Sequence, residues 1–112
     1  MFNIKYAKQM KTQSDNSPQP IENIGKGNYY VNMDVREVTE EGKTHYEYDC
    51  VRTVGYPTYG AVVEALVRER YSVSDELAIQ RQRDTKPEAF EEYNDFVEAC
   101  KDKARPVFFP SN

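Results

Sequence analysis

The sequence predicts a single α+β domain, in which an antiparallel β-hairpin and a short N-terminal strand pack against about three C-terminal helices. Two segments of the first half alternate apolar and polar residues around a turn, as the strands of a hairpin do. The second half repeats apolar residues at helical spacing behind capping motifs. With 112 residues the chain has the size of one domain, which we expect over 1–105, before a C-terminal tail over 106–112.

The N-terminal strand is indicated by Phe2, Ile4 and Tyr6, which alternate with polar residues. Its partner is not determined by the sequence. The segment 8–20 that follows is polar, contains two prolines and has no period, so we expect a flexible loop there.

The hairpin is predicted over 29–38 and 44–54, joined by turn residues in which Gly42 can adopt the positive φ of a tight connection. Alternation places one set of side chains on the buried face: Tyr29, Val31, Met33, Val35, Tyr46, Tyr48 and Cys50. The other set falls on a polar, solvated face: Asn32, Asp34, Arg36, His45, Glu47, Asp49 and Thr53. The short GKG run at 25–27 is expected to be a turn.

Capping motifs predict where the helices begin. Thr58 can cap a first helix over 58–71, and Ser72 with Asp75 forms a capping box ahead of a second over 73–83. A third is expected over 86–105, with Pro106 ending it, and all three are expected to cover one face of the sheet. Phe108 and Phe109 in the tail must then fold back or meet a partner.

The cysteines and the charge restrict the chemistry and the partners. Cys50 and Cys100 lie in phase with apolar neighbours, which favours reduced core thiols over a disulfide or a metal site, and no cofactor is implied. Fifteen basic and nineteen acidic residues give a net charge of −4, which favours protein partners over nucleic acid or an anionic membrane. No signal segment or transmembrane stretch is recognisable, so we expect a cytoplasmic protein.

An enzyme is one alternative, and it would depend on the hairpin. His45 is the only histidine, and the carboxylates of Asp34, Glu47 and Asp49 share the same strands. Arg36 and Arg52 lie on those strands too, so cross-strand ion pairs explain the pattern without catalysis. We therefore predict no enzymatic activity.

A nucleic-acid-binding regulator is the other alternative, because one region is locally basic and can contact anions: Arg68, Arg70, Arg81, Arg83 and Lys86. Acidic residues are interleaved with these cations, and cations near helix C-termini are favoured by the helix dipole. The structural interpretation is therefore preferred.

Aromatic residues suggest a protein interface. The chain has nine tyrosines, five phenylalanines and no tryptophan, and a domain of this size has little interior to hide them. The candidates for contact with a partner or a second copy are Tyr29, Tyr30, Tyr46, Tyr48, Phe108 and Phe109.

The segment 46–104 resembles a recurring module of small proteins of Bacteroides-type bacteria and their phages or prophages, a family without an established activity. The resemblance lies in the strand tyrosines, in Pro57, in the RERYS turn at 68–72, in the acidic cap that follows and in the aromatic repeat of the last helix. That helix is also similar to short C-terminal helices of phage tail-assembly accessory proteins. The resemblance implies a non-enzymatic structural or assembly accessory protein that acts through protein contacts, as a homo-oligomer, in the host cell or on the virion.

Overall fold

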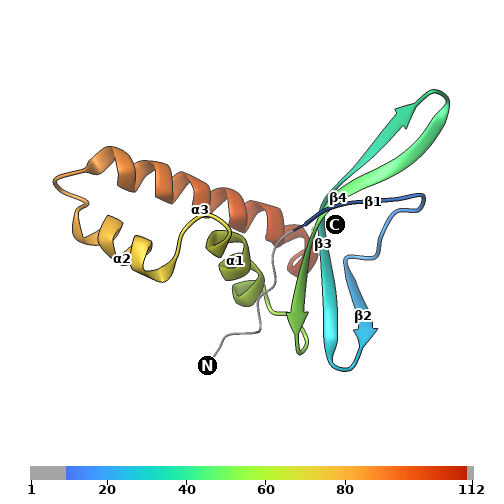
Figure 1. The fold of residues 1–112 in the computed structure, drawn as a ribbon, viewed down its shortest axis with the longest axis horizontal. Coiled ribbons are helices and arrows are strands. Elements are labelled where there is room, and N and C mark those ends of the chain that lie inside the picture. Colours follow the sequence, from blue (N-terminus) through green and yellow to red (C-terminus); the bar gives the residue numbers. More distant parts are fainter. Residues whose placement is uncertain (1–9, 111–112) are drawn as a thin grey trace.

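The structure is a computed structural model, in which residues 10–110 are described (Figure 1). It has the expected α+β fold, with one four-stranded antiparallel sheet of order β1-β4-β3-β2. The strands are β1 (Met10–Ser14), β2 (Ile21–Gly25), β3 (Asn28–Glu40) and β4 (Lys43–Val54), and the helices are α1 (Tyr59–Arg68), α2 (Val73–Arg81) and α3 (Pro87–Phe108). The strand expected at Phe2, Ile4 and Tyr6 lies outside the described residues.

The predicted hairpin is confirmed as β3 and β4. Val31 pairs with Val51, and the register continues to Glu40 opposite Lys43 at the turn. Glu41 and Gly42 both have positive φ, at 52° and 79°, as a two-residue hairpin connection requires. The hairpin tip projects beyond β1 and β2 (Figure 1).

The prediction of a loop over 8–20 is wrong for its first part, because β1 occupies 10–14 and pairs with β4, with Ser14 opposite Tyr46. A polar strand can lie at the edge of a sheet because main-chain bonds hold it there. The connection 15–20 then reaches the opposite edge, where β2 pairs with β3. It passes the face away from the helices, where Asn32 Nδ2 donates to the Gln19 main-chain oxygen at 2.8 Å.

Val35 was expected on the buried face, but its side chain is 40 % exposed. The cause is a β-bulge between Met33 and Arg36, which adds one residue to β3 and changes the phase of the strand. Asp34 carries the bulge with a φ of 55°, a left-handed conformation that aspartate tolerates better than most residues.

Asp49 was expected on the solvated face together with Asn32 and Thr53, and this prediction is also wrong, because Asp49 is fully buried and the other two are 3 % exposed. Asp49 pairs with Met33, and paired residues of antiparallel strands point to the same side. That side is covered by helices, and Lys103 of α3 places its Nζ 2.6 Å from Asp49 Oδ2. The pair joins the sheet to α3.

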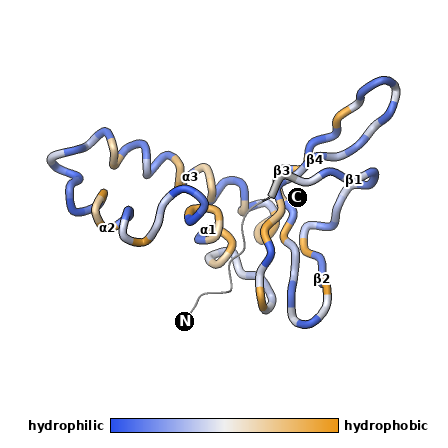
Figure 2. Tube along the Cα trace, in the orientation of Figure 1, coloured by the Kyte–Doolittle hydropathy of each residue, from blue (hydrophilic) through white to orange (hydrophobic). Residues whose placement is uncertain are grey.

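The core lies between the sheet, α1 and the C-terminal half of α3, where the apolar segments gather (Figure 2). Its buried members include Val31, Met33, Val51, Val62, Leu66, Cys100 and Ala104. The three helices were expected to cover one face together, but α2 lies against α3 away from the sheet (Figure 1). The molecule is therefore elongated, with a radius of gyration of 16.1 Å, compared with about 13 Å for a compact chain of this length. None of the helices within 10–110 is long and apolar enough to cross a membrane.

Pro106 was expected to end α3, but the helix continues to Phe108. The last turn is held by packing, since Val107 and Phe108 contact the core and the Phe108 ring lies 6.2 Å from that of Tyr59. Residues 106–108 are therefore part of the domain, and of the two predicted fates of the tail, Phe108 folds back. Phe109 lies 5.3 Å from the Tyr59 ring but remains 61 % exposed.

This difference predicts unequal effects of alanine at two adjacent positions. Phe108→Ala removes a ring packed against the core and should lower the free energy of unfolding by about 2 kcal/mol. Phe109→Ala removes a mainly exposed ring and should cost less than about 1 kcal/mol. Urea denaturation followed by circular dichroism measures both. Equal losses would contradict the packing of Phe108.

The thiols of Cys50 and Cys100 are free and buried. Burial, assisted by Glu22, raises the pKa of Cys50 from 9.0 to about 11, and burial also raises the pKa of Cys100. We expect Ellman's reagent to label the native protein at least about 100-fold more slowly than the unfolded protein, because the thiolate is the reactive form. Rapid native labelling would contradict this burial.

The raised pKa of Cys50 also predicts how stability depends on pH. An unfolded thiol loses its proton above pH 9 while native Cys50 keeps it, so the free energy of unfolding should fall from pH 9 towards 11.

Candidate protein interface

Helix α2 stands apart from the rest of the fold because none of its residues is buried. Val73 and Leu77 are 54 % and 53 % exposed. Residues four apart lie on the same side of a helix, so the two side chains form one apolar surface, called the α2 face below. A nine-residue helix is too short to be stable alone in water. Contacts with the rest of the protein must therefore hold it.

The N-terminus of α2 is held by the capping box that the sequence predicts. Ser72 Oγ accepts from the Asp75 main-chain N–H at 3.0 Å, and Asp75 Oδ2 accepts from the Ser72 N–H at 3.0 Å. The hydrogen bonds from Ser72 lower the pKa of the Asp75 carboxyl group. The box fixes the direction in which α2 leaves the preceding turn.

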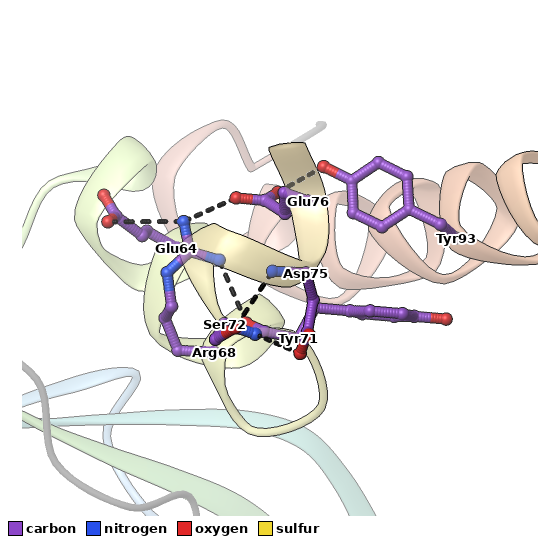
Figure 3. Close-up of polar contacts among 7 residues, drawn as sticks. All are labelled: Glu64, Arg68, Tyr71, Ser72, Asp75, Glu76 and Tyr93. Carbon is purple, nitrogen blue, oxygen red and sulfur yellow. Dashed lines mark hydrogen bonds and ion pairs between the residues drawn. The ribbon is translucent and has the colours of Figure 1, made fainter. Parts of the chain in front are cut away.

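Glu76 connects α2 to both neighbouring helices (Figure 3). One carboxylate oxygen lies 2.6 Å from the guanidinium of Arg68, at the end of α1, and the other accepts a hydrogen bond from the Tyr93 hydroxyl of α3. Arg68 also donates to the Tyr71 main-chain oxygen at 3.1 Å. We call Arg68, Glu76 and Tyr93 the Glu76 network. Burial, followed by the bond to Glu76, raises the pKa of Tyr93 to about 12, so the hydroxyl remains a donor at neutral pH.

Aromatic rings fill the joint beside this network. The Tyr71 ring meets that of Tyr93 edge-on at 5.1 Å and lies 5.6 Å from Phe96. Arg70 covers Tyr71 and Phe96 at 5.3 Å and 5.1 Å from their ring centres, and its guanidinium is 2.6 Å from Glu92. Polar and aromatic contacts together fix the turn between α1 and α2 against α3.

The five cations of the basic region are used differently from one another. Arg68 and Arg70 face carboxylates within the helical joint, and Arg83 lies over the Phe90 ring at 5.3 Å from its centre. Arg81 and Lys86 are exposed, at the end of α2 and just before α3. The structure thus places two of the five cations in ion pairs that support the fold, which does not favour a shared anion site.

The hairpin groups of the enzyme alternative lie in separate ion pairs. Asp34 is 2.6 Å from Arg36, within the same strand, and His45 is 3.0 Å from Glu47. These pairs follow the strand rather than crossing it as expected. Asp49 lies apart from both, buried against α3. Within residues 10–110, no cluster of three or more His, Cys, Asp or Glu side chains could hold a metal ion.

Most of the aromatic residues proposed as an interface are not exposed. Tyr48 is buried, and Tyr29, Tyr30, Tyr46 and Phe108 are half-buried, so Phe109 alone among the six is exposed. The α2 face was missed because Val73 and Leu77 were assigned to a helix packed on the sheet. Their spacing gave a weak signal, since α2 has few apolar residues on any side.

Comparison with known proteins adds no relative: no protein-family model, curated protein sequence or solved structure matches this chain.

Proposed function

We propose that this protein is a non-enzymatic structural or assembly accessory protein that acts through protein contacts, and that the α2 face is a contact surface. The observation that supports this proposal is a helix that buries none of its residues and yet is fixed by a capping box and by the Glu76 network. The proposed phage or prophage setting rests on the sequence resemblance of segment 46–104.

The physical argument concerns what α2 contributes. Ordering nine residues costs conformational entropy. Within the chain, α2 buries too little apolar surface to offset much of that cost. Val73 and Leu77 remain in water, and burying each fully in a contact would gain about 1.5 to 3 kcal/mol. The burial that would offset the entropy cost of ordering α2 is gained when another molecule covers the α2 face.

A second copy of the chain is the partner proposed for this surface. Two side chains alone cover too little area for a stable contact, which needs about 800 Å² on each partner. We call α2 and the neighbouring half of α3 the helical arm. Two such arms, one from each copy, can supply that area when they lie side by side around a two-fold axis and face each other along their length. The proposed assembly is therefore a homodimer closed through the helical arms.

Sedimentation velocity across micromolar concentrations tests this function. The intact protein should sediment as a dimer, and the double change Val73→Ser with Leu77→Ser should convert it to monomer at unchanged melting temperature, since neither side chain is buried in the chain. Val54→Ser is the matched control, because Val54 is 42 % exposed on the sheet. A monomer at all concentrations, or equal dissociation by the control, would contradict the proposal.

A further inference from the structure

Strand β4 extends beyond β1 at its C-terminal end. β1 begins at Met10, opposite Cys50, whereas β3 pairs with β4 as far as Val54, opposite Asn28. Among the described residues, no strand pairs with 51–54 on the side of β1. We call this stretch the open edge of β4. An edge of this kind offers main-chain N–H and C=O groups to which a further strand can bind.

An exposed apolar side chain marks the open edge. Val54 is 42 % exposed, although β4 is an inner strand of the sheet. Side chains alternate along a strand, so Val54 lies on the same face as Cys50, away from the helices. On that face β3 places only the polar Asn28 opposite Val54. The apolar surface of Val54 therefore remains in water at the place where β1 ends.

The N-terminal segment 1–9 lies outside the described residues, and the sequence places it directly before β1. Because β1 and β4 are antiparallel, a strand that continues β1 towards the N-terminus runs along β4 towards Val54. Residues 6–9 match the four residues of the open edge in number and need no turn to reach it. This segment is therefore long enough to occupy the open edge and already begins beside it.

The alternation of the N-terminal segment agrees with the face on which Val54 is exposed. When the register of β1 is continued, Tyr6 falls opposite Val54. Paired residues of antiparallel strands point to the same side, so this register brings an aromatic ring onto the exposed valine. A shift of one residue would place Lys5 or Ala7 there, and either has less apolar surface to bury.

We propose that residues 6–9 extend β1 along the open edge of β4 in the same chain, and that Tyr6 packs on Val54. Pairs of aromatic and β-branched residues across strands stabilise a sheet, and main-chain bonds to the open edge add to this contact. The bound segment also keeps strands of other molecules away from the open edge. This contact is independent of the α2 face.

Cysteine pairs in the full-length protein test the register. Tyr6→Cys with Val54→Cys should form a disulfide within one chain under air oxidation. Tyr6→Cys with Ile24→Cys is the matched control, because Ile24 is 41 % exposed but lies on β2, at the opposite edge of the sheet. We expect the first pair to oxidise at least about tenfold faster than the control, since a disulfide needs its two residues close together.

Nonreducing electrophoresis and peptide mapping measure the rate and identify the bond. The native thiols of Cys50 and Cys100 are buried in both variants and compete little. Equal rates for the two pairs would overturn the proposal. A disulfide between two copies would also overturn it, because the segment would then add to another molecule and not to its own chain.

A change of charge tests the same register without a covalent bond. Lys8 faces Arg52 when the register of β1 is continued, and like charges directly opposite each other weaken a strand pair. Lys8→Glu should therefore slow amide hydrogen exchange along the open edge about twofold to fivefold. Adding Arg52→Glu to this variant should reverse the gain, because it restores a like-charge pair.

Lys5→Glu is the matched control for this charge change, since it makes the same substitution beyond the end of the open edge. NMR of the ¹⁵N-labelled full-length protein resolves the amides of 51–54. Unchanged exchange in Lys8→Glu, or equal slowing by Lys5→Glu, would overturn the proposal. Sedimentation of the same variants reports on the α2 face, so failure of one proposal is distinguishable from failure of the other.

Discussion

Replacing Lys103 by methionine should lower the free energy of unfolding by about 3 kcal/mol, because it leaves the buried carboxylate of Asp49 without the cation that faces it. The methionine side chain can occupy much of the same volume, so lost packing contributes little. The Asp49 carboxylate is fully buried and lies 2.6 Å from the Lys103 ammonium. Breaking one half of such a pair costs far more than losing an exposed ion pair.

Lys101→Met is the matched control, since it removes the same charge from the same helix. Lys101 lies 3.2 Å from Glu98 in an exposed pair one turn apart, and its loss should cost less than about 0.5 kcal/mol. Guanidinium chloride denaturation of both variants gives the comparison. Similar losses for the two lysines would mean that the contact between Lys103 and Asp49 does not hold α3 to the sheet.

Glu76→Ala should release α2 while leaving the sheet, α1 and the C-terminal half of α3 folded. The variant removes the acceptor of two hydrogen bonds at once, one from Arg68 and one from Tyr93. Bonds to a charged group contribute about 1.5 to 3 kcal/mol each. We therefore expect amide hydrogen exchange in 73–81 to accelerate at least about tenfold, since α2 buries no residue that could hold it otherwise.

Two further variants separate the Glu76 network from a general effect of charge. Glu91→Ala removes an exposed carboxylate from α3 and should leave exchange in α2 unchanged. Tyr93→Phe should have a smaller effect than Glu76→Ala, because the ion pair with Arg68 remains. Exchange measured by mass spectrometry resolves the helix as one segment. Unchanged exchange in Glu76→Ala would show that the aromatic joint alone holds α2.

Local patterns were sufficient to predict the hairpin and the capped starts of α1 and α2. Alternation and a glycine turn determine β3 and β4, and the capping box of α2 depends on two residues three apart, so neither needs knowledge of the rest of the fold. The positions of β1 and β2 depend instead on edges that β3 and β4 offer once the hairpin exists. A polar segment such as 10–14 gives no local sign of that pairing.

The predictions that were wrong concern residues whose environment depends on the rest of the fold. Alternation assigned Asp49 to water, but Lys103 lies 54 residues away in sequence and supplies the charge that makes burial tolerable. A single bulge at Asp34 moved Val35 outward, and bulges leave little mark on composition. Pro106 lies inside α3 because the following residues pack on the core, a contact that outweighs one lost main-chain bond.

The candidate interface was not predictable for the same reason. Whether Val73 and Leu77 point to the core or to water depends on where α2 packs against α3. The sequence gives only the spacing of the two residues. The aromatic residues singled out instead were mostly absorbed by packing, as Tyr48 and Phe108 are.

Dilution of the ¹⁵N-labelled protein from millimolar to micromolar concentration tests the central claim, that the α2 face is a contact surface between copies. Amide signals of 73–81 and of the adjacent half of α3 should move with concentration, whereas those of the hairpin tip, 38–45, should not. Signals that stay unchanged throughout, or that move at the sheet while those of α2 remain fixed, would contradict the proposed role of α2.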